Sequence, residues 1–136
     1  STRGEGRRQV AGRSPDRGEA LPRDARIRHS AEIRALLERG KRERTPSLDV
    51  FIAASPSSRP RLGLIVPKHG RRIVDRNLLK RRLREIGRRN VLPRLAAAGV
   101  AVDVLIRARH RAYTADYDRL AEEVNGAVEA FWLSKS

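Results

Sequence analysis

Residues 61–92 read RLGLIVPKHGRRIVDRNLLKRRLREIGRRNVL, and this stretch joins a strand pattern to a helix pattern. In its first part the apolar side chains alternate, at Leu62, Leu64 and Val66. This alternation predicts a β-strand that ends at Pro67. In its second part the apolar side chains recur at i, i+4 and i+7, at Leu79, Leu83 and Ile86. That spacing predicts an amphipathic helix from about residue 76 to residue 92, and Pro93 and Gly99 predict its end.

The segments on either side supply four more elements. Upstream, we expect a helix between Ser30, a good N-cap, and Gly40, then a strand over residues 48–54 and a turn over residues 56–60. Downstream, residues 102–108 predict a strand that is apolar on both faces, which is typical of a central strand. Thr114 is expected to cap a last helix. Its apolar stripe is Tyr117, Leu120, Val124, Val128 and Phe131.

The order of these elements predicts the fold class. Helix, strand, strand, helix, strand and helix follow one another, which indicates an α+β protein, an αββαβα two-layer sandwich with helices packed on one small mixed sheet. Residues 1–26 carry seven arginines but only Val10 and Leu21 as sizeable apolar residues. We therefore expect a disordered basic tail over residues 1–26, one domain over residues 27–133 and a short C-terminal tail over residues 134–136.

Composition narrows the classes of function. The 136 residues include 31 lysines and arginines against 16 aspartates and glutamates, a formal net charge of +15. This favours a nucleic-acid partner over a merely basic surface or a membrane-surface protein, because arginine dominates and its planar fork matches phosphate oxygens. The absence of cysteine excludes disulfides, thiolate zinc sites and a cysteine nucleophile. No stretch is apolar and long enough to span a membrane, so we expect a soluble, cytoplasmic protein without a membrane partner.

The predicted middle helix concentrates the positive charge. Residues 68–94 hold eleven basic residues and two acidic ones, a net charge of +9. At 100° per residue, one helix face opposite the apolar stripe collects Asn77, Lys80, Arg81, Arg84 and Arg88. Like charges at i, i+4 repel, and a polyanion would remove that repulsion. We also expect Asn77 to lie in the first turn, where unpaired N–H groups can receive a phosphate.

The sequence motifs resemble those of the bacterial ribonuclease P protein family. In the run DRNLLKRRLREIGRR, residues 75–89, the residues that match the family signature are Arg76, Asn77, Lys80, Arg81 and Arg84. RLGLIVPKHG (61–70) resembles the strand and its lysine-containing exit, with Lys68 on the lysine. RIRHSAEIRALLERG (26–40) resembles the first helix, and DVLIRAR (103–109) with the capped helix that follows it resembles the closing strand and helix. The resemblance therefore spans about residues 26–132. Two positions depart from the pattern: Leu78 stands where the family has arginine, and Pro67 where it has a small polar residue.

The resemblance implies a function and a set of site residues. The protein would assist a catalytic RNA, the ribonuclease P RNA, in the endonucleolytic removal of the 5′ leader from precursor tRNA. The chemistry would belong to the RNA and its Mg²⁺ ions, with no cofactor, metal or catalytic residue in this chain. The residues expected to bind RNA are Lys68, Arg71, Arg72, Arg76, Asn77, Lys80, Arg81, Arg82, Arg84 and Arg88. Arg82 lies one turn beyond Leu78 and is expected to replace its missing contact.

The family also implies a cleft for the leader and an unusual topology. The aligned cleft positions are Ile33 and Phe51. For Phe51, strand alternation fits core packing against the first helix as well as stacking on a base. Ile33 would contact bases less strongly than an aromatic residue, and core packing fits it at least as well. The fold would resemble the second domain of ribosomal protein S5, with a left-handed crossover between the strands that flank the arginine helix, where the general rule predicts a right-handed one.

Two other classes share parts of the pattern. A ribosomal or other structural RNA-binding protein would have the same composition without a processing role. A DNA-binding regulator is disfavoured, because a recognition helix mixes Asn, Gln, Ser and Arg to read base edges, whereas this helix is nearly all cation. His29, His69 and His110 match no metal-ligand spacing.

Overall fold

The structure is a computed structural model that describes residues 25–135. Its elements are the helices α3 (Ser30–Arg39), α4 (Ile73–Ile86), α5 (Leu92–Ala97) and α6 (Tyr117–Lys135), the strands β2 (Lys41–Arg44), β3 (Leu48–Ala54), β4 (Arg61–Ile65) and β5 (Val102–Ala108), the π-helical turn η2 (Gly87–Val91) and the 3-10 turn η3 (His110–Tyr113). The strands form one mixed sheet in the order β2-β3-β5-β4. Only β4 and β5 pair in parallel, and α4 connects them. The α+β class and the mixed sheet are confirmed, and the left-handed sense of the crossover stays a prediction.

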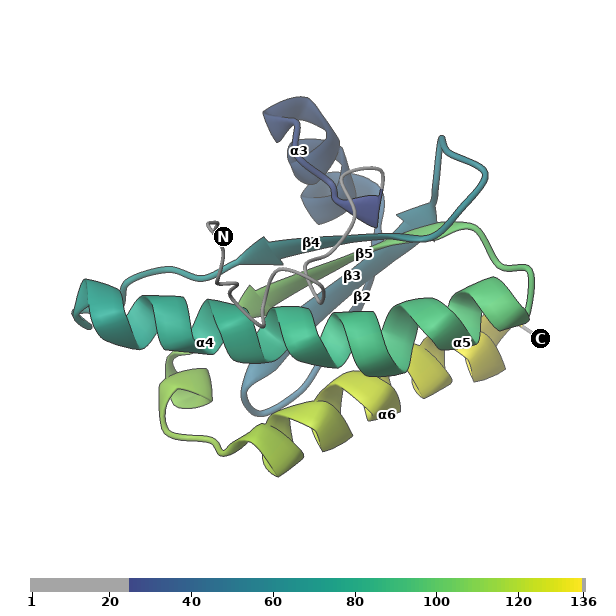
Figure 1. Cartoon of the computed structure of the whole chain (residues 1–136). Coiled ribbons are helices and arrows are strands. Elements are labelled where there is room, and N and C mark those ends of the chain that lie inside the picture. Colours follow the sequence, from purple (N-terminus) through teal and green to yellow (C-terminus); the bar gives the residue numbers. More distant parts are fainter. Residues whose placement is uncertain (1–24, 136) are drawn as a thin grey trace, which may run out of the picture.

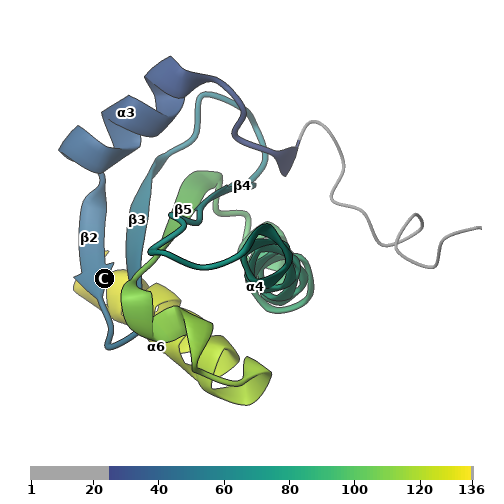
Figure 2. The ribbon, with the colours of Figure 1, turned by 90° about the vertical axis from the view of Figure 1, so that its left-hand side faces the viewer.

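Helices cover both faces of the sheet, and each face has its own apolar cluster. α4, α5 and α6 lie on one side and α3 on the other (Figures 1 and 2). The larger cluster joins the sheet to the three C-terminal helices, with Val50, Leu83 and Leu120 at its centre. The smaller cluster, beneath α3, consists of Ile27, Leu36, Phe51 and Leu105.

Strand alternation sorts the side chains between these clusters as expected. Leu48, Val50 and Ile52 of β3 enter the larger cluster, while Phe51 enters the smaller one. In β5, Val104 and Leu105 are both fully buried and belong to opposite faces. β5 is apolar on both faces because helices cover both faces of the sheet. It also lies between β3 and β4, so it is a central strand, as expected.

The structure contains one strand that was not predicted, β2, and a middle helix that is longer than predicted. β2 reads KRER and lies at the sheet edge, where charged side chains protect an open strand from further pairing, so it has no apolar alternation to detect. The helical segment begins at Ile73 and continues through η2 into α5 as far as Ala97. Pro93 does not end it, because this residue lies in the first turn of α5, where the N–H group that proline lacks is not needed.

Three expected boundaries are also corrected. Ala25 is buried in the larger cluster and Arg26 pairs with Leu62 of β4, so the fold includes two residues that we had assigned to the tail. The last helix is capped by Asp116, whose Oδ1 accepts the N–H of Arg119 at 2.8 Å, and not by Thr114. It runs to Lys135, into the expected C-terminal tail. The remainder of the proposed N-terminal tail, residues 1–24, lies outside the described residues.

A buried ion pair ties β4 to β5 and α3. Arg61 donates two hydrogen bonds to Asp103, from Nε at 2.8 Å and from Nη2 at 2.7 Å, and it also reaches Glu32 of α3 at 3.0 Å. Asp103, whose side chain is only 6% exposed, is directly opposite Arg61 in the parallel register. Hydrogen bonding to Asp103, against the opposing effect of burial, raises the pKa of Arg61. The guanidinium therefore stays charged and holds three elements together.

A second buried carboxylate, Glu123 of α6, organises the loop between β2 and β3. It accepts hydrogen bonds from the Ser47 backbone N–H at 2.8 Å and hydroxyl at 2.9 Å, and from the Thr45 hydroxyl. Burial acts to raise the pKa of Glu123, but these bonds and the one from Arg119 outweigh it, so the pKa lies below its usual value of 4.5. A lowered pKa means that the stabilisation is complete above the usual value and is lost as the pH falls through the folded value.

Replacing Glu123 by glutamine should lower the free energy of unfolding near neutral pH by about 1–3 kcal/mol, because buried donors lose their charged acceptor. The deficit should shrink as the pH falls below 4.5 and the wild-type carboxylate becomes protonated. Urea unfolding at several pH values measures this, with Glu122→Gln on the exposed side of α6 as the matched control. A deficit that stays constant down to acid pH would contradict the assignment.

Candidate nucleic-acid interface

The outer face of α4 carries a row of cations that pair with no carboxylate of residues 25–135. Leu79, Leu83 and Ile86 are buried against the sheet and α6, which turns the opposite side of the helix outward. Arg81 and Arg84 are exposed and Lys80 is half-buried. Within residues 25–135 no acidic side chain forms a salt bridge with Lys80, Arg81, Arg82 or Arg84. The repulsion inferred from the sequence therefore persists in the folded chain, and we name Lys80, Arg81 and Arg84 the cationic row.

Two residues of the expected cationic face, Arg88 and Asn77, do not have the surroundings that were predicted for them. Arg88 is already paired, because its Nη2 donates to Glu85 at 2.8 Å, and the same carboxylate binds Arg89. Glu85 lies one turn before both arginines, a spacing that could have been noticed in the sequence. Asn77 is the fifth residue of α4 and not part of its first turn, so its backbone N–H lies beyond the unpaired ones. Its side chain is exposed beside the cationic row.

The N-terminal end of α4 is held by the loop that leaves β4. Arg76 is anchored there, with its Nε donating to the Val66 carbonyl at 2.6 Å. The loop turns at His69 and Gly70, which both have positive φ angles, 48° and 76°. The turn leaves Lys68 exposed and places the Arg71 guanidinium 5.3 Å from the centre of the Tyr113 ring. Arg72, also exposed, forms a 3.5 Å surface pair with Asp75.

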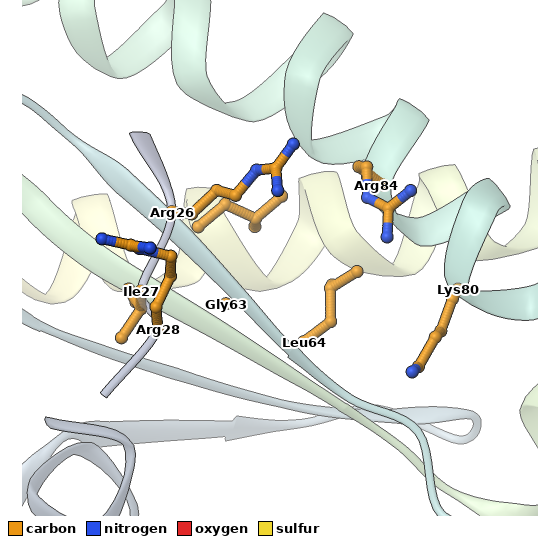
Figure 3. A pocket seen from close by; sticks show the side chains of 8 residues that line it. Arg26, Ile27, Arg28, Gly63, Leu64, Lys80 and Arg84 are labelled. Atoms are coloured by element: carbon orange, nitrogen blue, oxygen red, sulfur yellow. The ribbon is translucent and has the colours of Figure 1, made fainter. Parts of the chain in front are cut away.

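A groove of about 210 Å³ separates the cationic row from β4. Figure 3 shows Lys80 and Arg84 projecting from α4, Leu64 projecting from β4 toward them, and Arg26 on the far side of Leu64. Arg28 also lines the groove, so the lining residues within the described part of the chain include four cationic side chains and no acidic one. Gly63 forms the floor, and a side chain at that position would crowd Ile27 and Leu105. Such a groove concentrates positive potential where a phosphate can enter.

Leu78 and Arg82 lie on the flank of α4 that faces away from the groove. Leu78 stands where the family pattern has arginine, and Arg82 is the residue expected to replace it. Leu78 and Arg82 both line a small hollow of about 70 Å³, together with Arg71, Asp75 and Tyr113. They therefore share one side of the helix, as the sequence predicted. Arg82 is half-buried and has no acidic partner within the described part of the chain. That Arg82 replaces an RNA contact stays a prediction.

The expected leader cleft lies on the α3 side of the sheet, away from the cationic row. Ile33 is half-buried on α3 and packs on the smaller cluster. Phe51 is only 3% exposed, so the structure favours the packing alternative for its ring. The guanidinium groups of Arg107 and Arg42 lie over that ring, 5.2 Å and 5.8 Å from its centre.

Arg42 and Arg107 were not among the predicted site residues. Both bind Asp49, at 3.2 Å and 3.1 Å. Burial acts to raise the pKa of Asp49, but its hydrogen bonds to Arg107 and Arg42 outweigh this and lower the pKa. The sequence contained little signal for the pair, since the contact depends on the β2–β3 and β3–β5 registers. The same holds for Arg26 and Arg28, which precede the first helix and reach the groove only by pairing beside β4.

These features define the class of protein. Among the described residues there is no group of three or more His, Cys, Asp or Glu side chains that could hold a metal ion, and no helix has the length and apolarity to cross a membrane. A small α+β domain whose cationic helix face has no carboxylate partner within residues 25–135, and whose adjacent groove is lined by cations, has the surface expected of a nucleic-acid-binding protein.

Comparison with known proteins identifies the family. Residues 21–132 match the model of the family described as Ribonuclease P. The chain is 38% identical over 118 residues to the ribonuclease P protein component of Micrococcus luteus, covering 79% of this chain and 88% of that one. It is 39% identical over 110 residues to that of Desulfovibrio desulfuricans, covering 76% and 80%. This chain belongs to the ribonuclease P protein family, whose members are subunits of the endoribonuclease that processes tRNA.

Solved structures agree on the fold. The RNase P protein of Staphylococcus aureus superposes with a TM-score of 0.65 at 20% identity, covering 78% of this chain and 94% of that one. That of Thermotoga maritima gives a TM-score of 0.62 at 23% identity, covering 74% and 92%. At this identity the likeness supports the architecture alone.

Proposed function

We propose that this protein binds ribonuclease P RNA through the cationic row and the adjacent groove, and that the assembled particle removes the 5′ leader of precursor tRNA. The observation that carries the proposal is the cationic row of α4, which has no carboxylate partner within residues 25–135. Phosphate contacts made by such a row release condensed counterions and need no base recognition. The catalytic Mg²⁺ ions would be held by the RNA, and the particle would act in the cytoplasm.

The leader would lie across the α3 side of the sheet. Phe51 is covered by Arg42 and Arg107, so an unpaired base would first meet their guanidinium planes. Guanidinium planes stack on bases and also attract the leader's phosphates. We therefore assign the first contact with the leader to Arg42, whose side chain is 47% exposed. Phe51 would support these arginines from below.

Reconstitution tests the proposal. Added to a bacterial ribonuclease P RNA at a Mg²⁺ concentration at which the RNA alone is inactive, the protein should restore cleavage of precursor tRNA. The complex should also bind the precursor more tightly than mature tRNA. Arg42→Gln should reduce this preference about threefold to tenfold, because stacking on one base contributes about 1–3 kcal/mol and only part of it is lost.

One control variant and two distinct outcomes separate the possible failures. Arg94→Ala removes an exposed arginine of α5 that pairs with Glu129 of α6 at 3.6 Å, on the face of the sheet opposite α3, and it should leave the preference unchanged. Absence of cleavage would refute the processing role. Cleavage with equal affinity for precursor and mature tRNA would refute only the leader site.

A further inference from the structure

The exposed face of α4 is apolar at one end and cationic at the other. The described residues include three exposed large hydrophobic side chains, Ile73 (65% exposed), Val74 (66%) and Leu78 (42%), and all three belong to the first six residues of this helix. Elsewhere in the described chain, comparable side chains are at least partly covered. A single exposed aliphatic residue needs no explanation, but three within the first two turns of one helix indicate a binding surface.

The apolar and cationic residues lie in the same helical rows. Ile73 precedes Lys80 and Arg84 by seven and eleven residues, and Val74 precedes Arg81 by seven, while Leu78 lies beside Val74 on the flank of Arg82. Residues at these spacings lie above one another on a helix. A molecule that contacts the cationic row therefore passes directly over Ile73 and Val74 if it extends toward the start of α4.

We infer that Ile73, Val74 and Leu78 form an apolar ridge that packs against unpaired bases of the RNA bound by the cationic row. The inference rests on the proposed RNA binding and adds a second kind of contact to it. Aliphatic side chains cannot replace the water around a phosphate, but they can cover the flat, apolar face of a base or the carbon face of a ribose. The ridge would therefore favour loops, bulges and junctions, where bases are unstacked, over continuous duplex.

Charge argues against a second copy of this chain as the occupant. A symmetric dimer through this face would oppose one cationic row with another, since the same patch serves both partners. Arg71 and Arg72 extend the positive charge along the loop before the ridge. The chemistry around the ridge thus fits a polyanion whose apolar parts reach the three aliphatic side chains.

The test measures, for each variant, the affinity for RNA and the dependence of that affinity on salt concentration. The double variant Ile73→Ala/Val74→Ala keeps the charge and should fold normally, because both side chains are exposed and alanine is the better helix former. Its affinity for a bacterial ribonuclease P RNA should fall about tenfold, or about 1.4 kcal/mol, with an unchanged log–log salt slope. Arg81→Ala is the matched comparison on the same helix and should flatten the slope. A fully paired RNA duplex should bind the double variant as it binds the wild type.

Several outcomes would overturn the inference. Affinity within twofold of the wild type would exclude a contact, and an equal loss on the duplex would exclude unpaired bases as its target. Sedimentation that shows a wild-type dimer and a monomeric double variant with unchanged RNA affinity would assign the ridge to a second copy. If the wild-type chain did not bind the RNA at all, the proposed function itself would fail, and the two failures are thereby distinguished.

Discussion

Simultaneous replacement of Lys80, Arg81 and Arg84 by alanine is expected to weaken binding to ribonuclease P RNA by at least about a hundredfold. Each hydrogen bond to a charged group contributes about 1.5–3 kcal/mol, and three would be lost together. Each lost phosphate contact should also reduce the log–log salt slope by about 0.7–0.9, so the slope should fall by about 2. Equilibrium binding over a range of KCl concentrations measures both quantities.

The control removes the same charge from other surfaces. Arg34 and Arg39 are exposed on α3, and Arg94 is exposed on α5, so a variant with alanine at these three positions has the same net charge as the test variant. Precursor tRNA is omitted, so that only the interaction with the catalytic RNA is measured. If the two triple variants lost affinity equally, the binding would reflect net charge and not the position of the cationic row.

The largest effect on stability is expected at Arg61. Its replacement by alanine should lower the free energy of unfolding by about 3–5 kcal/mol, because the Asp103 carboxylate would remain buried without a countercharge. The side chains of this pair are 12% and 6% exposed, so water cannot take over the role of the guanidinium. Urea or thermal unfolding measures the change, and the melting temperature should fall by more than about 10 °C for a domain of this size.

Two companion variants show whether the buried Asp103 carboxylate causes the loss of stability in Arg61→Ala. Arg94→Ala breaks a pair whose side chains are 42% and 66% exposed, and it should cost less than about 1 kcal/mol. The double variant Arg61→Leu/Asp103→Leu removes both charges and should recover much of the stability, since apolar residues can replace a buried pair. A loss from Arg61→Ala no larger than that from Arg94→Ala would contradict the assigned role.

Most of the architecture followed from periodicity. The alternation in residues 48–54 and 102–108 assigned each side chain of β3 and β5 to a face, and the spacing of Leu79, Leu83 and Ile86 oriented α4. These patterns were reliable because burial imposes a period of 2 on strands and 3.6 on helices. β2 escaped detection since an exposed edge strand has no such constraint. Pro93 was misread because its effect depends on where the helical hydrogen bonding is interrupted.

The candidate site was predictable in part. Lys80, Arg81 and Arg84 could be placed on one face because a helix converts spacing into direction, and the motif match pointed to the same residues. Arg88 forms a salt bridge with Glu85 and is therefore not an unpaired member of this face, and this pairing depends on side-chain geometry within one helical turn. For Phe51, alternation identified the face but could not show that Arg42 and Arg107 cover the ring.

The sequence by itself determined the α+β class, the orientation of the arginine-rich helix and the excess of positive charge, because these depend on residue types and short-range spacing. The tertiary structure alone decided which cations have no carboxylate partner within residues 25–135, that Arg26 and Arg28 face Lys80 and Arg84 across a groove, and that Ile73 and Val74 are not covered by the other described elements. The physical reason is the separation along the chain of the residues on which each property depends. Helix and strand periods are local, whereas ion pairing, groove formation and burial depend on strands and helices that come together from distant parts of the chain.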